Sequence, residues 1–299
     1  MRNAIITAAL ATICLSTVAL AQSSDISLKA TEIIPGLTML EGEGGFVGGN
    51  MTLLTGDDAT VLIDDGLEPF GSLLLEAINM HAERPVDFVI NTHVHGDHVG
   101  SNRILHLAGA TIVGHDNIRK RLMENGWQTD QGSRPPKPGE LPQVTFSDAV
   151  TFHLNGHTAY VFHVDHAHTD GDSVIHFTDI NVISSGDVLF NGLFPFIDLD
   201  SGGSVAGYLA AQERILELAD QNTRIIPGHG PLASKADLQA AHDMLFDANA
   251  RIKSRVDAGK TEQQILSENP LADYDADWSW DFISTETMTK ALYRSNNSH

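Results

Sequence analysis

One ten-residue segment concentrates side chains that bind metal ions. It reads Asn91-Thr92-His93-Val94-His95-Gly96-Asp97-His98-Val99-Gly100. Side chains two positions apart on an extended segment point the same way, so His93 and His95 can converge on one ion. Gly96 permits a sharp turn, which directs Asp97 and His98 to a neighbouring position. Imidazole and carboxylate suit zinc, and these residue types also leave iron or manganese open.

The single cysteine, Cys14, lies in an N-terminal segment typical of a secretory signal. Arg2 precedes an apolar stretch over residues 4–15, and Ala19-Leu20-Ala21 fits a small-residue cleavage site. The stretch is too short to span a bilayer comfortably. We therefore expect residues 1–21 to be a cleaved signal peptide and the protein to be periplasmic or secreted. The mature chain has no thiol, so its metal site must use His, Asp and Glu.

Apolar runs bounded by Gly, Asp and Asn predict strands, and helical patterns fall between or after them. The expected strands are Leu37–Leu40, Met51–Thr55, Thr60–Ile63, Phe88–Ile90, Thr111–Val113, Ala149–Leu154, Tyr160–Val164, Val174–Phe177, Val182–Ile183 and Arg224–Ile226. The expected helices are Ser72–His81, Val99–Leu107, Asn117–Glu124, Val205–Leu218 and Lys235–Ala258. This order predicts an α/β protein with two sheets sandwiched by helices.

Two segments are expected to be long loops, residues 42–50 and 126–142. The first is rich in glycine, and the second carries Trp127 and four prolines. Long loops beside a site often form lids or substrate walls, although ordinary surface loops are an equal alternative here. The candidate pocket walls are Phe46, Trp127, Asn191, Phe194 and Phe196. For the run Leu193-Phe194-Pro195-Phe196, a place in the core is an equal alternative.

The ten-residue segment resembles the H-x-H-x-D-H motif of the metallo-β-lactamase-fold superfamily, and three further blocks match that family in order. They are His168-Thr169-Asp170-Gly171-Asp172, Ser185-Gly186-Asp187 and Ile226-Pro227-Gly228-His229-Gly230. The resemblance covers most of the mature chain. It implies one domain over residues 22–299, folded as an αββα four-layer sandwich with the metals at one edge. The candidate ligands follow apolar, strand-like runs, where open α/β sheets place their ligands.

The resemblance also implies a set of ligands for two zinc ions. The first ion is held by His93, His95 and His168, the second by Asp97, His98 and His229, and Asp187 bridges both. Two carboxylates leave the pair of ions with a net positive charge, which favours a hydroxide and an anionic intermediate. His166 shares the alternation face of His168 and is its alternative. His115, which follows a predicted strand, is a weaker candidate.

The activity implied by the resemblance is that of a β-lactamase-like, zinc-dependent hydrolase. A metal-bridging hydroxide would attack a carbonyl carbon, and Asp97 would take or relay the proton. Export fits a β-lactam-like amide or a lactone or ester as substrate. An aspartate bridge with a terminal histidine is similar to glyoxalase II, and so favours thioesterase and lactonase branches. A thioester hydrolase, a mononuclear iron sulfur dioxygenase and a non-catalytic periplasmic metal-binding protein are the alternatives.

Charge restricts the partners of the chain. Its 299 residues carry 18 Lys and Arg against 39 Asp and Glu, a formal net charge of −21. A nucleic acid or an anionic membrane would be repelled by this excess of negative charge. We therefore expect a small-molecule substrate, without a nucleic-acid or membrane partner. No pattern in the sequence indicates an oligomeric state.

Overall fold

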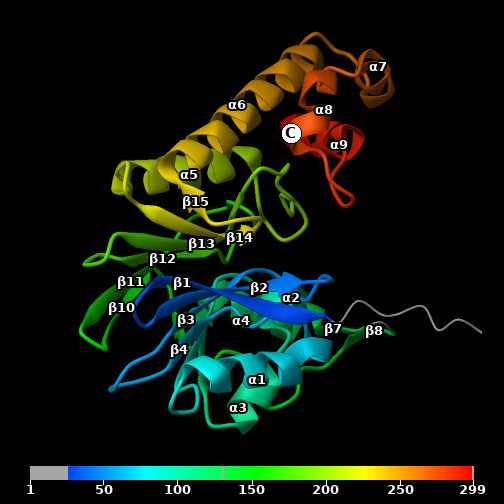
Figure 1. The fold of residues 1–299 in the computed structure, drawn as a ribbon. Coiled ribbons are helices and arrows are strands. Elements are labelled where there is room, and N and C mark those ends of the chain that lie inside the picture. Colours follow the sequence, from blue (N-terminus) through cyan, green and yellow to red (C-terminus); the bar gives the residue numbers. More distant parts are fainter. Residues whose placement is uncertain (1–25, 130, 298–299) are drawn as a thin grey trace, which may run out of the picture.

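The computed structural model describes residues 26–129 and 131–297 (Figure 1). The predicted signal peptide, residues 1–21, lies outside the described residues. Among the residues that the structure describes, no helix combines the length and apolar character that crossing a bilayer requires.

The first sheet has seven strands in the order β1-β2-β3-β4-β5-β6-β9. They are β1 (Ser27–Ile34), β2 (Leu37–Glu43), β3 (Met51–Leu54), β4 (Val61–Ile63), β5 (Phe88–Asn91), β6 (Thr111–His115) and β9 (Val144–Phe146). The first four pair antiparallel, and β4, β5, β6 and β9 run parallel. Parallel neighbours need crossover connections, which here contain helices. These are η1 (Glu68–Phe70), α1 (Gly71–His81), α2 (Gly96–Val99), α3 (Asn102–Leu107) and α4 (Asp116–Asn125).

The second sheet has six strands in the order β10 to β15. They are β10 (Ala149–Leu154), β11 (His157–His163), β12 (Ser173–Phe177), β13 (Val182–Phe190), β14 (Arg224–His229) and β15 (Ala233–Ser234). Only the β13–β14 pair is parallel, and helix α5 (Val205–Leu218) connects its two strands. All nine residues of β13 are buried, because both faces of this strand are covered.

Four layers follow from the alternation of side chains along the strands. In β4, Val61 and Ile63 pack between the two sheets, whereas Leu62 faces the outer side together with residues of α1 and α3. Helix α5 and the first half of α6 (Lys235–Asp257) cover the outer face of the second sheet. This arrangement confirms the predicted αββα sandwich (Figure 1).

Helix α6 continues beyond the sheet and carries a C-terminal helical lobe (Figure 1). The lobe consists of α7 (Glu262–Glu268), η2 (Ala272–Tyr274), α8 (Asp275–Trp278) and α9 (Thr285–Asn297). Leu238 and Ala241 of α6 pack on the second sheet, while Leu245 and Ile252 belong to a separate core shared with Leu292. One long helix therefore joins the sandwich to the lobe, whose helices the sequence patterns did not single out.

Two expectations need correction. The helix predicted over Val99–Leu107 is two helices, α2 and α3, because the amide of Gly100 donates to Gly66 O and that of Ser101 to the Asp65 carboxylate. These two amides therefore do not form the hydrogen bonds that would continue α2 into α3, and the helix is interrupted at Gly100 and Ser101. The loop predicted over residues 126–142 contains a hairpin, formed by β7 (Trp127–Thr129) and β8 (Gly132–Arg134).

Candidate metal centre

The predicted ligands meet at one edge of the two sheets. His93 and His95 follow β5, Asp97 and His98 lie in α2, His168 lies between β11 and β12, Asp187 lies in β13, and His229 ends β14. Two groups of these side chains offer ligand atoms that all lie within 4.8 Å of one another. One contains His93, His95, His168 and Asp187, and the other contains Asp97, His98 and His229.

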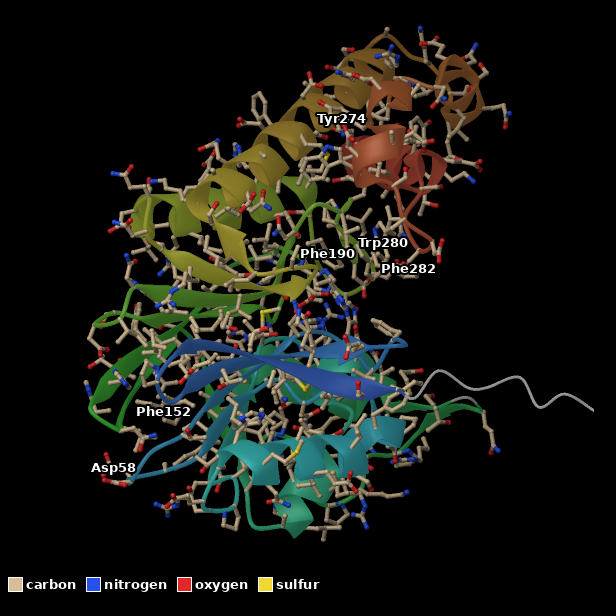
Figure 2. The ribbon with its side chains drawn as sticks, viewed as in Figure 1. Asp58, Phe152, Phe190, Tyr274, Trp280 and Phe282 are labelled. Carbon is tan, nitrogen blue, oxygen red and sulfur yellow. The ribbon has the colours of Figure 1, made fainter. Side chains whose placement is uncertain are left out.

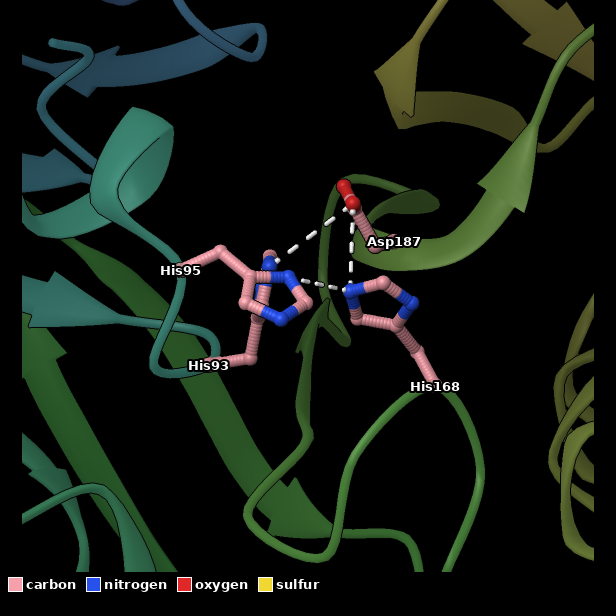
Figure 3. A group of neighbouring side chains, drawn as sticks. All are labelled: His93, His95, His168 and Asp187. Carbon is pink, nitrogen blue, oxygen red and sulfur yellow. Dashed lines mark hydrogen bonds and ion pairs between the residues drawn. The ribbon is translucent and has the colours of Figure 1, made fainter. Parts of the chain in front are cut away.

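The first group is a set of three imidazoles around one carboxylate (Figure 3). His168 Nε2 lies 2.8 Å from His95 Nδ1. Asp187 Oδ2 lies 3.4 Å from His168 Nε2 and 3.7 Å from His93 Nε2. The nitrogens of all three rings thus face the same small volume beside Asp187, as in a site for a single ion.

The second group adds a carboxylate of its own. Asp97 Oδ2 lies 3.3 Å from His229 Nε2 and 3.6 Å from His98 Nε2. The two imidazole nitrogens are 3.4 Å apart. Asp187 reaches this group as well, with Oδ1 3.1 Å from His98 and Oδ2 3.5 Å from His229. Asp187 is therefore the side chain that the two groups share.

Two glycines let the chain approach these ligands closely. A Cβ at Gly228 would lie 2.0 Å from Asp187 Oδ1, and one at Gly49 would lie 2.1 Å from the His98 ring. Any larger residue at either position would displace a ligand. Backbone hydrogen bonds from Gly49 N to Asp97 O and from Asn50 N to Gly228 O fix the glycine-rich loop against both ligand segments.

Asp64 orients one ligand of each group. The Thr92 hydroxyl donates to Asp64 at 2.7 Å, so its oxygen accepts from His93 Nδ1 at 3.0 Å. His98 Nδ1 donates to the same carboxylate at 2.8 Å. Since an ionised carboxylate only accepts, these bonds hold a proton on each outer nitrogen and direct the inner Nε2 atoms toward the position of a metal.

The other two imidazoles of the first group are oriented in the same manner. His168 Nδ1 donates to the carbonyl oxygen of Phe196 at 2.7 Å, which directs Nε2 inward. In His95 the two ring nitrogens exchange these roles: Nε2 donates to Asp198 at 2.9 Å, and Nδ1 faces His168. Hydrogen bonds of this kind to the outer nitrogens are typical of histidines that bind metals.

The two groups differ in how the protein sets their charge. Burial lowers the pKa of His93 well below its ordinary value and that of His168 to about 4. Burial also opposes a charge on His98 and His229, but nearby carboxylates, Asp187 foremost, outweigh it. They raise the pKa of His98 well above its ordinary value and that of His229 to about 9.

The residues present fit a bound metal ion. His93 Nε2 is buried and has no hydrogen-bond partner among the described residues. A buried nitrogen without a partner is costly, and a metal ion among these donors would satisfy it. The donor set of imidazoles and carboxylates is typical of zinc hydrolases, and no thiolate takes part.

The two alternative histidines lie elsewhere. His166 is exposed, and its Nδ1 donates to Gly202 O. His115 stacks on His163 at 3.8 Å between ring centroids, and its Nε2 bonds to Ser147 O. Neither belongs to the clusters of possible ligands in the described part of the chain.

Two acidic residues of the site were missed in the sequence. Asp64 directly follows a predicted strand, the same signal that pointed to His93, so it could have been found. Asp198 lies 103 positions from His95 in a segment without a recognisable pattern, and only the folded chain shows the pairing.

The candidate pocket walls divide into three kinds. Phe46 and Phe196 contact ligand rings, with centroids 6.0 Å from His229 and 5.7 Å from His95. Trp127 lines a separate hollow of about 510 Å³ with Val94 and Gly96. Two candidates are not walls as the structure has them: Phe194 is fully buried in the core of the helical lobe, and Asn191 is buried with its amide bonded to Pro231 O.

Comparison with known proteins supports the same assignment. The family model described as Metallo-beta-lactamase superfamily matches residues 44–229. Acyl-coenzyme A thioesterase MBLAC2 of Homo sapiens is 28% identical over 209 residues, which cover 60% of this chain and 72% of that protein. Hydroxyacylglutathione hydrolase of Methylococcus capsulatus is 32% identical over 126 residues, or 40% of this chain and 44% of that protein.

Solved structures share the fold at low sequence identity. The metallo-beta-lactamase from Pontibacter korlensis superposes with a TM-score of 0.60 at 20% identity, over 73% of this chain and 99% of that one. The sec-alkylsulfatase Pisa1 from Pseudomonas sp. superposes with a TM-score of 0.67 at 17% identity, over 89% of this chain and 50% of that one. The family match spans more than half of the chain and includes all the predicted ligands. This protein therefore belongs to the metallo-beta-lactamase superfamily and has the site of a metal-dependent hydrolase.

Proposed function

We propose that this protein is a dinuclear zinc hydrolase that cleaves an ester, a lactone or a thioester. The observation that carries the proposal is the position of Asp187 between two groups of ligands, with Oδ2 near His168 and Oδ1 near His98. One carboxylate placed in this way can serve two ions. His93, His95 and His168 would complete the first site, and Asp97, His98 and His229 the second.

The side chains around the ions have separate tasks. Two zinc ions bound here would supply Lewis acidity and a water molecule of lowered pKa. Asp97 is the better exposed of the two carboxylates, with 21% of its side chain exposed against 4% for Asp187. Burial raises the pKa of Asp97, but His98 and His229 outweigh burial and lower it, so the carboxylate is ionised at neutral pH. We assign it the role of holding the second ion and accepting a proton.

The relatives support an acyl substrate. Two of them are named as an acyl-coenzyme A thioesterase and a hydroxyacylglutathione hydrolase, and the second site here uses oxygen and nitrogen ligands only. A β-lactam-like amide is the second candidate, which the predicted export of the chain favours.

The test is a substrate panel run on protein of known metal content. Zinc-loaded protein is offered p-nitrophenyl esters, an S-acyl thioester, a lactone and nitrocefin, before and after EDTA. We expect hydrolysis of at least one acyl substrate, its loss with EDTA and its return with zinc. If zinc-loaded protein turns over none of them, the proposal is wrong; bound iron with sulfur dioxygenase activity would also contradict it.

We further propose that the protein is exported and loses residues 1–21. The basis is the sequence pattern of that segment, with its A-x-A site before Gln22. N-terminal sequencing of protein recovered from a bacterial periplasm should begin at Gln22. A retained N-terminus on protein found only in the cytoplasm would contradict export.

A further inference from the structure

A group of aromatic side chains lies against three of the candidate ligands, His95, His168 and His229, and none of the roles described above accounts for it. We call it the aromatic wall, defined as Phe190, Phe196, Trp280 and Phe282. Figure 2 shows Phe190, Trp280 and Phe282 gathered where the loop after α8 comes down from the helical lobe toward the sheets. Two of these residues thus come from a part of the chain beyond the family match, which ends at residue 229.

The wall is continuous from ring to ring. Phe196 and Phe282 have centroids 5.4 Å apart, Phe282 and Trp280 5.5 Å, and Trp280 and Phe190 6.1 Å. Such spacings are typical of aromatic side chains in contact. Phe190 is buried and lies behind Trp280, so the accessible part of the wall is formed by Phe196, Trp280 and Phe282.

Both groups of ligands touch the wall. Phe196 lies 5.7 Å from the rings of both His95 and His168. Phe190 stacks on His229 at 4.8 Å. A substrate whose reacting carbonyl lies at the ligands can therefore place a neighbouring group against these rings.

The position of Trp280 in the wall is fixed by the protein, whereas Phe282 is open to solvent. Trp280 Nε1 donates to the carbonyl of Phe194, which fixes the indole, and Ile283 anchors the loop in the core of the lobe. The Phe282 side chain next to them is 58% exposed. An exposed phenyl ring beside a reaction centre favours a ligand that would cover it.

A hollow also adjoins the site at His229. It measures about 360 Å³, and its lining includes Phe46, Asn50 and His229. Phe46 is 59% exposed and lies nearly parallel to the His229 ring. Apolar rings thus flank His229 from two segments, residues 46 and 190, far apart in the sequence.

We propose that the aromatic wall binds the apolar acyl chain of the substrate and makes the enzyme selective for longer acyl groups. This inference rests on the proposed acyl hydrolysis. The rings that reach solvent, Phe196, Trp280 and Phe282, offer no charged group, so burying hydrocarbon against them is the interaction available. Because Phe282 is exposed, its truncation removes binding surface without opening a core cavity.

The experiment compares p-nitrophenyl acetate with p-nitrophenyl hexanoate. Wild type should show a higher kcat/KM for hexanoate. In Phe282→Ala and Trp280→Ala this value should fall about tenfold, mainly through KM, while acetate changes less than threefold. Phe282→Leu should recover most of the loss. Phe246→Ala is the matched control, because Phe246 is 60% exposed on α6 outside the wall.

Binding separates this inference from the proposed activity. Calorimetry on zinc-loaded protein with hexanoate and acetate, which share a carboxylate, isolates the effect of the chain. Hexanoate should bind at least fivefold more tightly than acetate, and Phe282→Ala should reduce this preference. If no substrate of the panel is hydrolysed but the preference for hexanoate holds, the proposed function is wrong and the binding role of the aromatic wall is supported. Equal affinities for hexanoate and acetate, or a preference for hexanoate that is unchanged in Phe282→Ala, would contradict the proposed role of the aromatic wall.

Discussion

The two halves of the metal centre are built from similar residues but in opposite electrostatic settings. Among the described residues, the half with His93, His95 and His168 has no carboxylate ligand apart from the shared Asp187, and burial holds the pKa of His93 and His168 low. The other half places Asp97 next to His98 and His229, and carboxylates hold the pKa of both imidazoles high.

This difference has a chemical consequence. Imidazoles of low pKa present free lone pairs at neutral pH, so an ion can bind them without displacing protons. Imidazoles of high pKa keep protons that a second ion must displace, while Asp97 supplies negative charge for that ion. We infer that the first half binds a metal ion without releasing protons, and that the second half releases protons when its metal ion binds.

The largest effect is expected from His168→Ala, which removes a buried ligand of the first half. We expect activity to fall by more than the roughly 10- to 100-fold that changes in outer partners cause. The matched control is His166→Ala, since His166 is exposed and bonded to Gly202 O. It should stay within a few-fold of wild type in a steady-state assay. A large loss of activity in His166→Ala together with a small loss in His168→Ala would show that the ligand is assigned two residues away from its true position.

Asp97→Asn tests the second half by itself. The amide cannot accept a proton and binds an ion less well, so kcat should fall roughly 100-fold or more. The first half should keep its metal in elemental analysis. Asp243→Asn, on the exposed face of α6, is a control for the same chemical change. Activity of Asp97→Asn within a few-fold of wild type would exclude the proton-accepting role.

Asp198→Asn should act on the first half alone and more weakly. Without the carboxylate that His95 Nε2 faces at 2.9 Å, affinity for the first ion should fall about 10- to 100-fold. Asp200→Asn is the matched control in the same loop, because Asp200 pairs with Arg294 instead. Zinc titration against a competing chelator measures both. An equal loss in the two variants would mean that the loop, and not the hydrogen bond, matters.

The smallest effect concerns protons released on metal binding. His229, with a pKa of about 9, holds a proton at pH 7, whereas His168, with a pKa of about 4, does not. The second ion should therefore release more protons than the first, and its affinity should weaken faster as pH falls. Calorimetry on stripped protein at pH 7, in buffers of different ionisation enthalpy, counts these protons. Release of the same number of protons by both ions would contradict the proposed electrostatic difference between the two halves.

The strand and helix patterns predicted the layered fold, and a local signal pointed to four of the candidate ligands, whereas His168, Asp187 and His229 were proposed from the resemblance to the family. His93, His95, Asp97 and His98 stand within six residues, directly after a buried strand. Their outer partners were harder to predict, since Asp198 becomes a neighbour of His95 only when the loop after β13 folds over the site.

The aromatic wall lay beyond sequence reasoning for a similar reason. Phe196 was a candidate, but Trp280 and Phe282 belong to a lobe whose helices were not singled out. Their position depends on how far α6 extends past the sheet and on the core of the lobe around Leu292 and Ile283. The hairpin at Trp127 was missed because its strands have only three residues each, too short for an alternating pattern.

The central claim is that two ions share Asp187, and native mass spectrometry of zinc-loaded wild type and Asp187→Ala tests it most directly. We predict two zinc ions per wild-type chain. In Asp187→Ala the second ion should be lost at concentrations that saturate wild type, with the first retained more weakly and activity abolished. A single zinc ion in wild type, bound equally well by Asp187→Ala, would contradict the account.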